Sequence, residues 1–159
     1  MTRVLLGLGS NLGNKEKNIV EAITRISAFS TIKKKSHLYR TEPVGFIDQP
    51  WFLNCAIEIE TEVTPYELLS LVKSIEKKLG RKKTIAYGPR QIDIDILFYG
   101  DLVLKTKDLV VPHPLIQDRL FVLQPLLDID PFFIHPVQKK TIQELYKRLS
   151  ATHDVQLYK

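Results

Sequence analysis

Hydrophobic residues recur along the chain with two periods, at every second residue in some segments and at every third or fourth residue in others. Alternation at every second residue predicts strands, whereas the longer spacing predicts helices with one apolar side. The segments with strand character are 3–9, 32–41, 52–62 and 92–98. The segments with helix character are 15–29, 65–80 and 141–149, and residues 115–129 suggest short helical turns. The predicted order is therefore strand, helix, strand, loop, strand, helix, strand.

Cap and turn residues separate these segments. Asn14 can cap the first helix, and the capping box Thr64-Pro65-Tyr66-Glu67 with its proline opens the second, which Gly80 closes. Residues 42–51 contain two prolines and a glycine and form a long loop, and residues 99–102 suggest a hairpin turn into a short strand. This order predicts an α+β sandwich of ferredoxin-like type, with a mainly antiparallel sheet whose helices cover one face and leave the other for loops.

The composition is that of an ordinary globular protein. The 159 residues are 44% hydrophobic and 26% charged, and we expect a single domain over 1–159. Cys55 is the one cysteine, which excludes an internal disulfide and fits a reducing compartment. The apolar run 4–8 is too short for a signal peptide or a membrane span. We therefore expect a cytoplasmic protein with no membrane partner.

Positive charge is concentrated in one part of the chain. Of the net charge of +5, residues 73–90 hold seven basic side chains against Glu76 alone, which gives +6, and the remainder holds 16 basic against 17 acidic, which gives −1. A focused positive segment attracts anions. A small nucleic-acid-binding module would also use such a segment. However, Tyr87 is the only aromatic residue in 73–90, and the sequence has no RNP, KH or helix-turn-helix signature. A small polyanion is the favoured ligand.

Two carboxylates stand out in the last strand. Asp93 and Asp95 point to the same face, about 7 Å apart, because side chains alternate along a strand. They repel each other unless a cation or a shared proton lies between them. Hard oxygen ligands close to basic residues suggest Mg²⁺ carrying a polyphosphate. The pattern alone also fits a half-exposed antiparallel strand with Asp on the wet face, although Asp is depleted in strands.

Several familiar motifs are absent. Gly7 and Gly9 follow a strand as in a dinucleotide fingerprint, but Leu12 stands where the third glycine belongs. The chain has no P-loop and no G-x-S-x-G elbow. Its four histidines lack metal-ligand spacing. These absences exclude a Rossmann site, a P-loop kinase and an acyl-transfer serine.

Four motifs in order resemble the 6-hydroxymethyl-7,8-dihydropterin pyrophosphokinases of folate biosynthesis. They are Gly9-Ser10-Asn11-Leu12-Gly13, Tyr39-Arg40-Thr41-Glu42-Pro43-Val44-Gly45 with its continuation to Asn54, Gly88-Pro89-Arg90-Gln91-Ile92-Asp93-Ile94-Asp95, and Val111-Pro112-His113 followed by Arg119 and Phe121. The third is the family signature. The resemblance extends over essentially the whole chain.

The resemblance implies that pyrophosphate passes from ATP to the hydroxymethyl group of the pterin, with release of AMP, in tetrahydrofolate biosynthesis. It implies two Mg²⁺ ions bound by Asp93 and Asp95, and the catalytic residues Arg81, Arg90 and Asp95. The ATP-binding residues that it implies are Lys73, Glu76, Lys83, Ile96, His113 and Arg119. The pterin-binding residues that it implies are Thr41, Val44, Phe52, Asn54, Tyr87 and Phe121.

Other interpretations of these residues remain. Arg90 could cap the strand entry, and Phe52 could belong to the core as most aromatic residues do. A non-catalytic pterin- or nucleotide-binding relative is the main alternative function, and its mark would be the loss of an Asp or of Arg90. We expect a monomer that binds ATP and the pterin and no nucleic acid, with loops 42–51 and 81–90 closing over the substrates.

Overall fold

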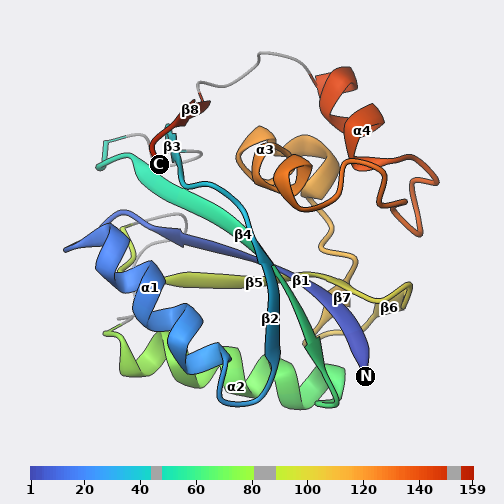
Figure 1. Ribbon diagram of the computed structural model, residues 1–159, viewed down its shortest axis with the longest axis horizontal. Helices are drawn as coiled ribbons and strands as arrows, with labels where there is room; N and C mark the ends of the chain where they lie inside the picture. Colours follow the sequence, from blue (N-terminus) through green and yellow to red (C-terminus); the bar gives the residue numbers. More distant parts are fainter. Residues whose placement is uncertain (44–47, 81–88, 150–154) are drawn as a thin grey trace.

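The computed structural model describes residues 1–43, 48–80, 89–149 and 155–159. The strands of the main sheet are β1 (Thr2–Ser10), β2 (Thr31–Lys35), β3 (Tyr39–Thr41), β4 (Phe52–Thr61), β5 (Asp93–Tyr99) and β8 (Val155–Leu157). They follow the order β5-β1-β4-β3-β8, and β2 also pairs with β4 (Figure 1). All these pairings are antiparallel. A separate hairpin pairs β6 (Leu104–Lys105) with β7 (Val110–Val111).

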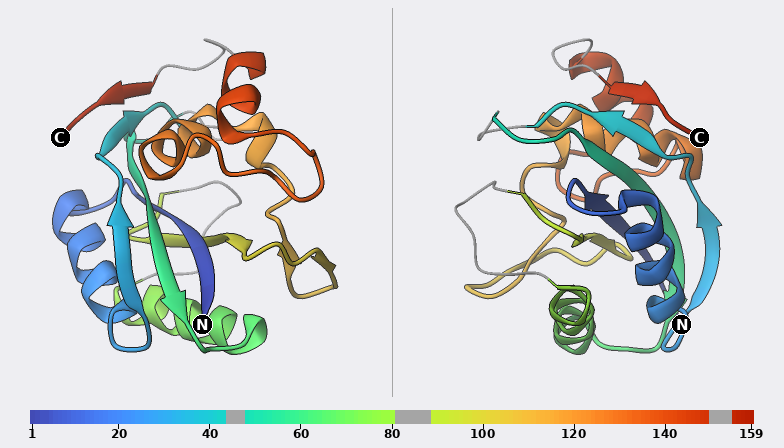
Figure 2. Two further views of the ribbon diagram at one scale, coloured as in Figure 1. Left: turned by 45° about the vertical axis from the view of Figure 1, so that its right-hand side comes forward. Right: turned by 90° about the vertical axis from the view of Figure 1, so that its left-hand side faces the viewer.

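Helices lie on both faces of the sheet. They are α1 (Lys15–Ile26), α2 (Pro65–Lys78), α3 (Leu120–Ile129) and α4 (Ile142–Leu149), with a short 3-10 turn at Ile116–Asp118. In Figure 2, α1 and α2 lie on one side of the sheet, and α3 and α4 lie on the other. Among the described residues, no helix is long and apolar enough to cross a membrane. The α+β, ferredoxin-like class is confirmed, but the expectation that helices cover one face only was wrong.

Two hydrophobic clusters explain this arrangement. The first lies between the sheet and α1 with α2, and it includes Leu6, Ile57 and Ile94. The second lies under α3 and α4, where Leu97 and Phe98 provide much of the apolar surface. A register shift in the pairing of β1 with β5 lets these two adjacent residues reach the same cluster. The face that carries the aspartates is therefore apolar at its far end, and α3 and α4 cover that end.

Local signals set the helix starts. The Asn14 side chain accepts a hydrogen bond from the backbone N–H of Lys17, and the predicted capping box between Thr64 and Glu67 is confirmed. The first helix ends at Ile26 instead of Phe29. Cap side chains satisfy the free N–H groups of the first helical turn without any tertiary partner. The first residue of a helix can therefore be predicted from the local sequence.

Other segments differ from the prediction because of tertiary pairing. Residues 32–41 form two strands, β2 and β3, separated at Ser36, whose N–H donates to Ala56 O and whose Oγ accepts from Ala56 N–H. Residues 120–129 form one helix instead of short turns. The chain turns at 99–102, but β6 then pairs with β7 and not with β5. Strand β8 was not predicted at all.

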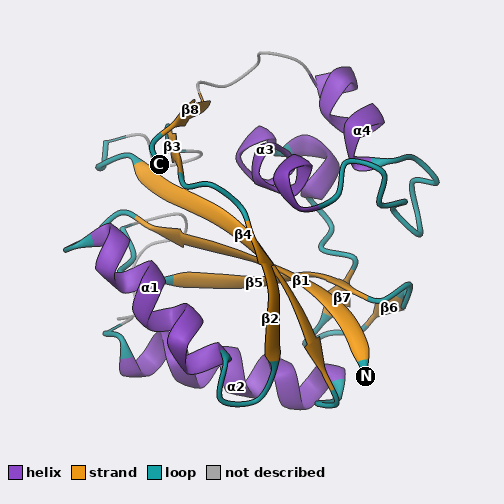
Figure 3. Ribbon diagram, viewed as in Figure 1, coloured by secondary structure: helices purple, strands orange, loops and turns teal. Residues whose placement is uncertain are grey.

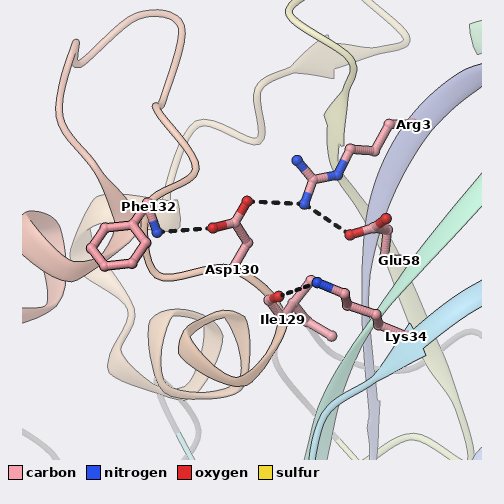
Figure 4. A network of polar contacts seen from close by, with 6 residues as sticks. All are labelled: Arg3, Lys34, Glu58, Ile129, Asp130 and Phe132. Carbon is pink, nitrogen blue, oxygen red and sulfur yellow. Dashed lines mark hydrogen bonds and ion pairs between the residues drawn. The ribbon is translucent and has the colours of Figure 1, made fainter.

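A polar network attaches the end of α3 to the sheet (Figure 4). The Arg3 guanidinium donates to Glu58 at 2.8 Å and to Asp130 at 3.1 Å. The other oxygen of Asp130 accepts from the N–H of Phe132 at 3.0 Å. Lys34 donates to the carbonyl of Ile129 at 3.2 Å. Residues from β1, β2 and β4 thus fix the C-terminal end of the helix whose other end reaches the pocket described below.

We expect Cys55 to be unreactive in the native protein. The side chain is 4% exposed, and burial raises the pKa of its thiol to about 12. The thiol is therefore protonated at pH 8, whereas the thiolate is the reactive form. With an aromatic disulfide reagent at pH 8, we expect negligible labelling of native protein and one thiol per chain in denaturant. Rapid labelling of native protein would contradict this environment.

Candidate active site

A pocket of about 280 Å³ opens on the sheet face that carries the two aspartates. Its walls come from β1, β3, β4 and β5, with contributions from α2, the segment after β7 and the start of α3. Ten of the residues expected from the resemblance line it: Thr41, Phe52, Asn54, Lys73, Arg90, Asp93, Asp95, His113, Arg119 and Phe121. Residues far apart in the chain therefore meet in one cavity of a size suited to a small ligand.

Two glycines of β1 form the floor of this pocket. Gly7 pairs with Asp95, and Gly9 pairs with Asp93 on one side and with Asn54 on the other. A Cβ at Gly9 would lie 2.7 Å from the Asn54 Nδ2, and one at Gly7 would lie 3.3 Å from a Leu97 methyl carbon. The glycines that suggested a dinucleotide fingerprint instead leave space between the carboxylates and the amide.

The negative charges of the two carboxylates repel each other. Both Asp93 and Asp95 line the pocket, on the face opposite Ile94. Burial and the negative charge of Asp93 raise the pKa of Asp95 to about 7, against the opposing charges of Arg119 and Lys73. A bound cation would stabilise the charged form of Asp95 in this environment. Within the described residues, no group of three or more His, Cys, Asp and Glu side chains forms a metal centre.

Glu76 and Ile96 do not line the pocket. The Glu76 side chain is 1% exposed, and its Oε2 accepts a hydrogen bond from the N–H of Ile94 at 2.8 Å. Its Oε1 lies 3.6 Å from the Lys73 Nζ. Ile96 is 6% exposed and belongs to the cluster on the opposite face of the sheet. Glu76 therefore contacts the backbone of β5 between the two aspartates, on the edge of the sheet where no strand of the described residues pairs.

At the other end of the pocket, two aromatic rings and two polar side chains come together. Thr41 Oγ1 donates to Asn54 Oδ1 at 2.5 Å, and both side chains are buried. Phe52, which pairs with Thr41, lines this end; Phe121 also lines the pocket, and the Arg119 guanidinium lies 5.4 Å from the centre of its ring. This end offers apolar faces together with an oriented amide, a combination that suits a flat heterocycle.

His113 is held as a neutral imidazole. Burial, together with the nearby charge of Arg119, lowers its pKa to about 4. Its backbone N–H donates to Leu97 O, and its Nδ1 accepts from the N–H of Leu115 at 3.2 Å. The Nδ1 is thus an acceptor, so the proton resides on Nε2. His113 can offer an N–H donor to an anion at neutral pH without adding charge.

Asn11 does not line the pocket, but it holds the backbone of Arg90, which does, and the resemblance assigned it no individual role. It is 1% exposed, and its Nδ2 donates to Gln49 Oε1 at 2.8 Å and to the carbonyl of Pro50 at 2.9 Å. Its Oδ1 accepts from the N–H of Arg90, whose carbonyl accepts from the N–H of Asn11. One side chain therefore joins two loops. The signal available in the sequence was a polar amide directly after a buried strand.

Four expected site residues, Val44, Arg81, Lys83 and Tyr87, lie outside the described residues. The other positions suffice to define the class of protein. On this ferredoxin-like sheet, the paired carboxylates, the surrounding cationic side chains and the adjoining aromatic residues are the groups that a transferase using a metal–nucleotide complex needs.

Comparison with known proteins agrees with this class. The sequence profile of the 7,8-dihydro-6-hydroxymethylpterin-pyrophosphokinase (HPPK) family matches residues 5–131. The chain is 45% identical over 144 residues to the 2-amino-4-hydroxy-6-hydroxymethyldihydropteridine pyrophosphokinase of Aquifex aeolicus, covering 91% of this chain and 90% of that protein. It is 42% identical over 154 residues to the enzyme of the same name from Methylorubrum extorquens, covering 96% of each. The chain belongs to the HPPK family.

Some relatives are much longer. The chain is 42% identical over 153 residues to the folic acid synthesis protein fol1 of Pneumocystis carinii, but it spans only 20% of that protein. Among solved structures, the wild-type HPPK-DHPS of Plasmodium falciparum with pteroate matches 92% of this chain and 42% of its own, with a TM-score of 0.76 at 19% identity. That likeness establishes the fold alone.

Proposed function

We propose that this protein transfers pyrophosphate from ATP to the hydroxymethyl group of 6-hydroxymethyl-7,8-dihydropterin in folate synthesis. In this reaction the hydroxyl oxygen attacks the β-phosphorus, the bond to the α-phosphate breaks, and AMP leaves. Family membership supports the activity. The observation that carries it in the structure is the single pocket shared by the Asp93/Asp95 pair and the aromatic, amide-lined end near Asn54.

The residues present fit a magnesium-bound nucleotide. Asp93 and Asp95 are hard oxygen ligands, and the raised pKa of Asp95 indicates a pair that a cation would stabilise. Magnesium commonly binds through one or two carboxylates together with substrate phosphates, so a pair is enough on the protein side. When bound, the metal neutralises phosphate charge and orients the attacking oxygen. Two such ions, held by Asp93 and Asp95, are part of this proposal.

The remaining polar residues would act on the phosphates by charge and position. Arg90 and Arg119 are fixed cations that can bind phosphate oxygens in a bidentate manner, and Lys73 adds a third positive charge. His113 would donate its Nε2–H. Phosphoryl transfer depends mostly on such electrostatic stabilisation, and burial makes each contribution larger.

Thr41, Asn54, Phe52 and Phe121 would hold the pterin. The rings would cover its two faces, and the Asn54 amide, oriented by Thr41, would bind its polar edge. Because the amide is already held at 2.5 Å by Thr41, little side-chain entropy would be lost on binding. This end of the pocket would therefore select the ring and present its hydroxymethyl group to the phosphates.

Nucleotide product analysis tests the proposed function. Purified protein with Mg·ATP should form AMP, and no ADP, only when 6-hydroxymethyl-7,8-dihydropterin is added. Formation of ADP would instead indicate γ-phosphoryl transfer. Absence of turnover in folded protein would favour a binding protein. The predicted monomeric state and cytoplasmic location are further parts of the proposal, testable by light scattering and by cell fractionation.

Gly9→Ala should weaken pterin binding. The new Cβ would lie 2.7 Å from the Asn54 Nδ2, so the amide must turn away from its position. Loss of one oriented hydrogen bond corresponds to about a tenfold rise in the KM for the pterin. Gly7→Ala is the matched control, because its Cβ would meet a Leu97 methyl carbon at 3.3 Å and not the amide. Equal effects of the two variants on the pterin KM would contradict the role of Asn54.

A further inference from the structure

The end of the chain forms a strand that covers the outer edge of β3. In this pairing Thr41 lies opposite Val155, and Tyr39 lies opposite Leu157. Beyond the strand, the N–H of Tyr158 donates to the carbonyl of Leu38 at 2.8 Å. Residues 155–158 thus pair with β3 and with the residue before it, and Figure 1 shows β8 beside β3.

Strand β3 connects this C-terminal strand to the proposed pterin residues. On its other side it pairs with β4, where Thr41 lies opposite Phe52 and Tyr39 lies opposite Asn54. With three residues, β3 is short even for a strand, and short strands need neighbours on both sides to be well ordered. The position of Thr41, which orients Asn54, therefore depends on both neighbours.

The two ends of β3 are held differently. Tyr39 Oη donates to Asp128 Oδ2 at 2.7 Å, and the N–H of His37 donates to the same oxygen at 3.1 Å, so α3 fixes the first end. For the second end, at Thr41, the covering residue on the outer side is Val155. Loss of β8 should consequently affect Thr41 more than Tyr39.

We propose that β8 is a positioning element for the pterin end of the active site. It holds β3 so that Thr41 and Asn54 keep the geometry that binds the heterocycle. The proposal rests on the pterin site inferred above. The carboxylates lie on β5, at the opposite edge of the sheet, with β1 and β4 between them and β3 (Figure 3). The effect of β8 should therefore be selective for the pterin over ATP.

Two variants test this: a chain ending at residue 154, and Gln156→Pro, which removes a backbone N–H at the residue paired with Arg40. We expect a rise of about tenfold in the KM for the pterin, with the KM for ATP within about twofold of wild type. Leu157→Ala is the matched control, because that side chain is 64% exposed and the strand pairing is kept. Its pterin KM should be unchanged.

Ile142→Val controls for general loss of stability. Ile142 is the first residue of α4, is fully buried and does not line the pocket, and the change should lower the free energy of unfolding by about 0.5–1.5 kcal/mol. An equal rise in pterin KM in this variant, or an equal rise in ATP KM on truncation, would overturn the role of β8. Wild-type protein that forms no pterin-dependent AMP would overturn the proposed function instead, so the two failures are distinguishable.

Discussion

Asp95→Asn should reduce pterin-dependent formation of AMP by about 10³-fold, equivalent to about 4 kcal/mol of transition-state stabilisation. The substitution keeps the shape of the side chain and removes the charge that would hold the metal–nucleotide complex. Because burial and Asp93 already raise the pKa of Asp95 to about 7, neutralisation should cost the fold little. Initial rates over a wide range of Mg²⁺ concentration, together with thermal unfolding, measure both effects.

Asp101→Asn is the matched control for this result. Asp101 lies at the exposed turn after β5, so the same change of charge occurs close by in sequence but outside the pocket. Its activity should stay within about twofold of wild type, as for other surface substitutions. If Asp95→Asn retained more than a tenth of the wild-type rate, or if excess Mg²⁺ restored full activity, a direct role of the carboxylate in holding the nucleotide would be untenable.

Phe98→Ala should produce the largest loss of stability among the changes considered, about 3–5 kcal/mol. The ring is 1% exposed, its centre lies 4.6 Å from that of Phe133 and 5.3 Å from that of His135, and it belongs to the cluster beneath α3 and α4. Its removal leaves a cavity between the sheet and both helices. In a protein of this size the melting temperature should fall by about 10 °C.

Phe132→Ala is the matched control for this loss of stability, because Phe132 directly precedes Phe133, the residue that packs on Phe98. Phe132 is 69% exposed, so Phe132→Ala should change the free energy of unfolding by less than about 0.5 kcal/mol. Denaturant unfolding with a common slope for all three proteins measures the difference. A loss below 1 kcal/mol in Phe98→Ala, or similar losses in both variants, would show that the cluster beneath α3 does not hold that layer on the sheet.

What the sequence determined by itself is mostly local. Alternation along a strand fixes Asp93 and Asp95 on one face, and cap residues fix where helices begin, because neither depends on distant partners. The order of strands and helices was enough for the ferredoxin-like class. The resemblance named sixteen site residues, and ten of them line one pocket in the structure.

Tertiary structure alone decided the contacts between distant segments. Gly9 became the floor of the pocket because β4 brings Asn54 against it, and the pKa of Asp95 rises because the surrounding elements bury it. The layer of α3 and α4 and the pairing of β8 with β3 also escaped prediction. A three-residue exposed strand shows no useful alternation, and which face a helix covers depends on apolar surface that other strands contribute. Sequence patterns encode the local conformation of residues that are adjacent in the chain, whereas side-chain burial and strand register depend on contacts made by the whole chain.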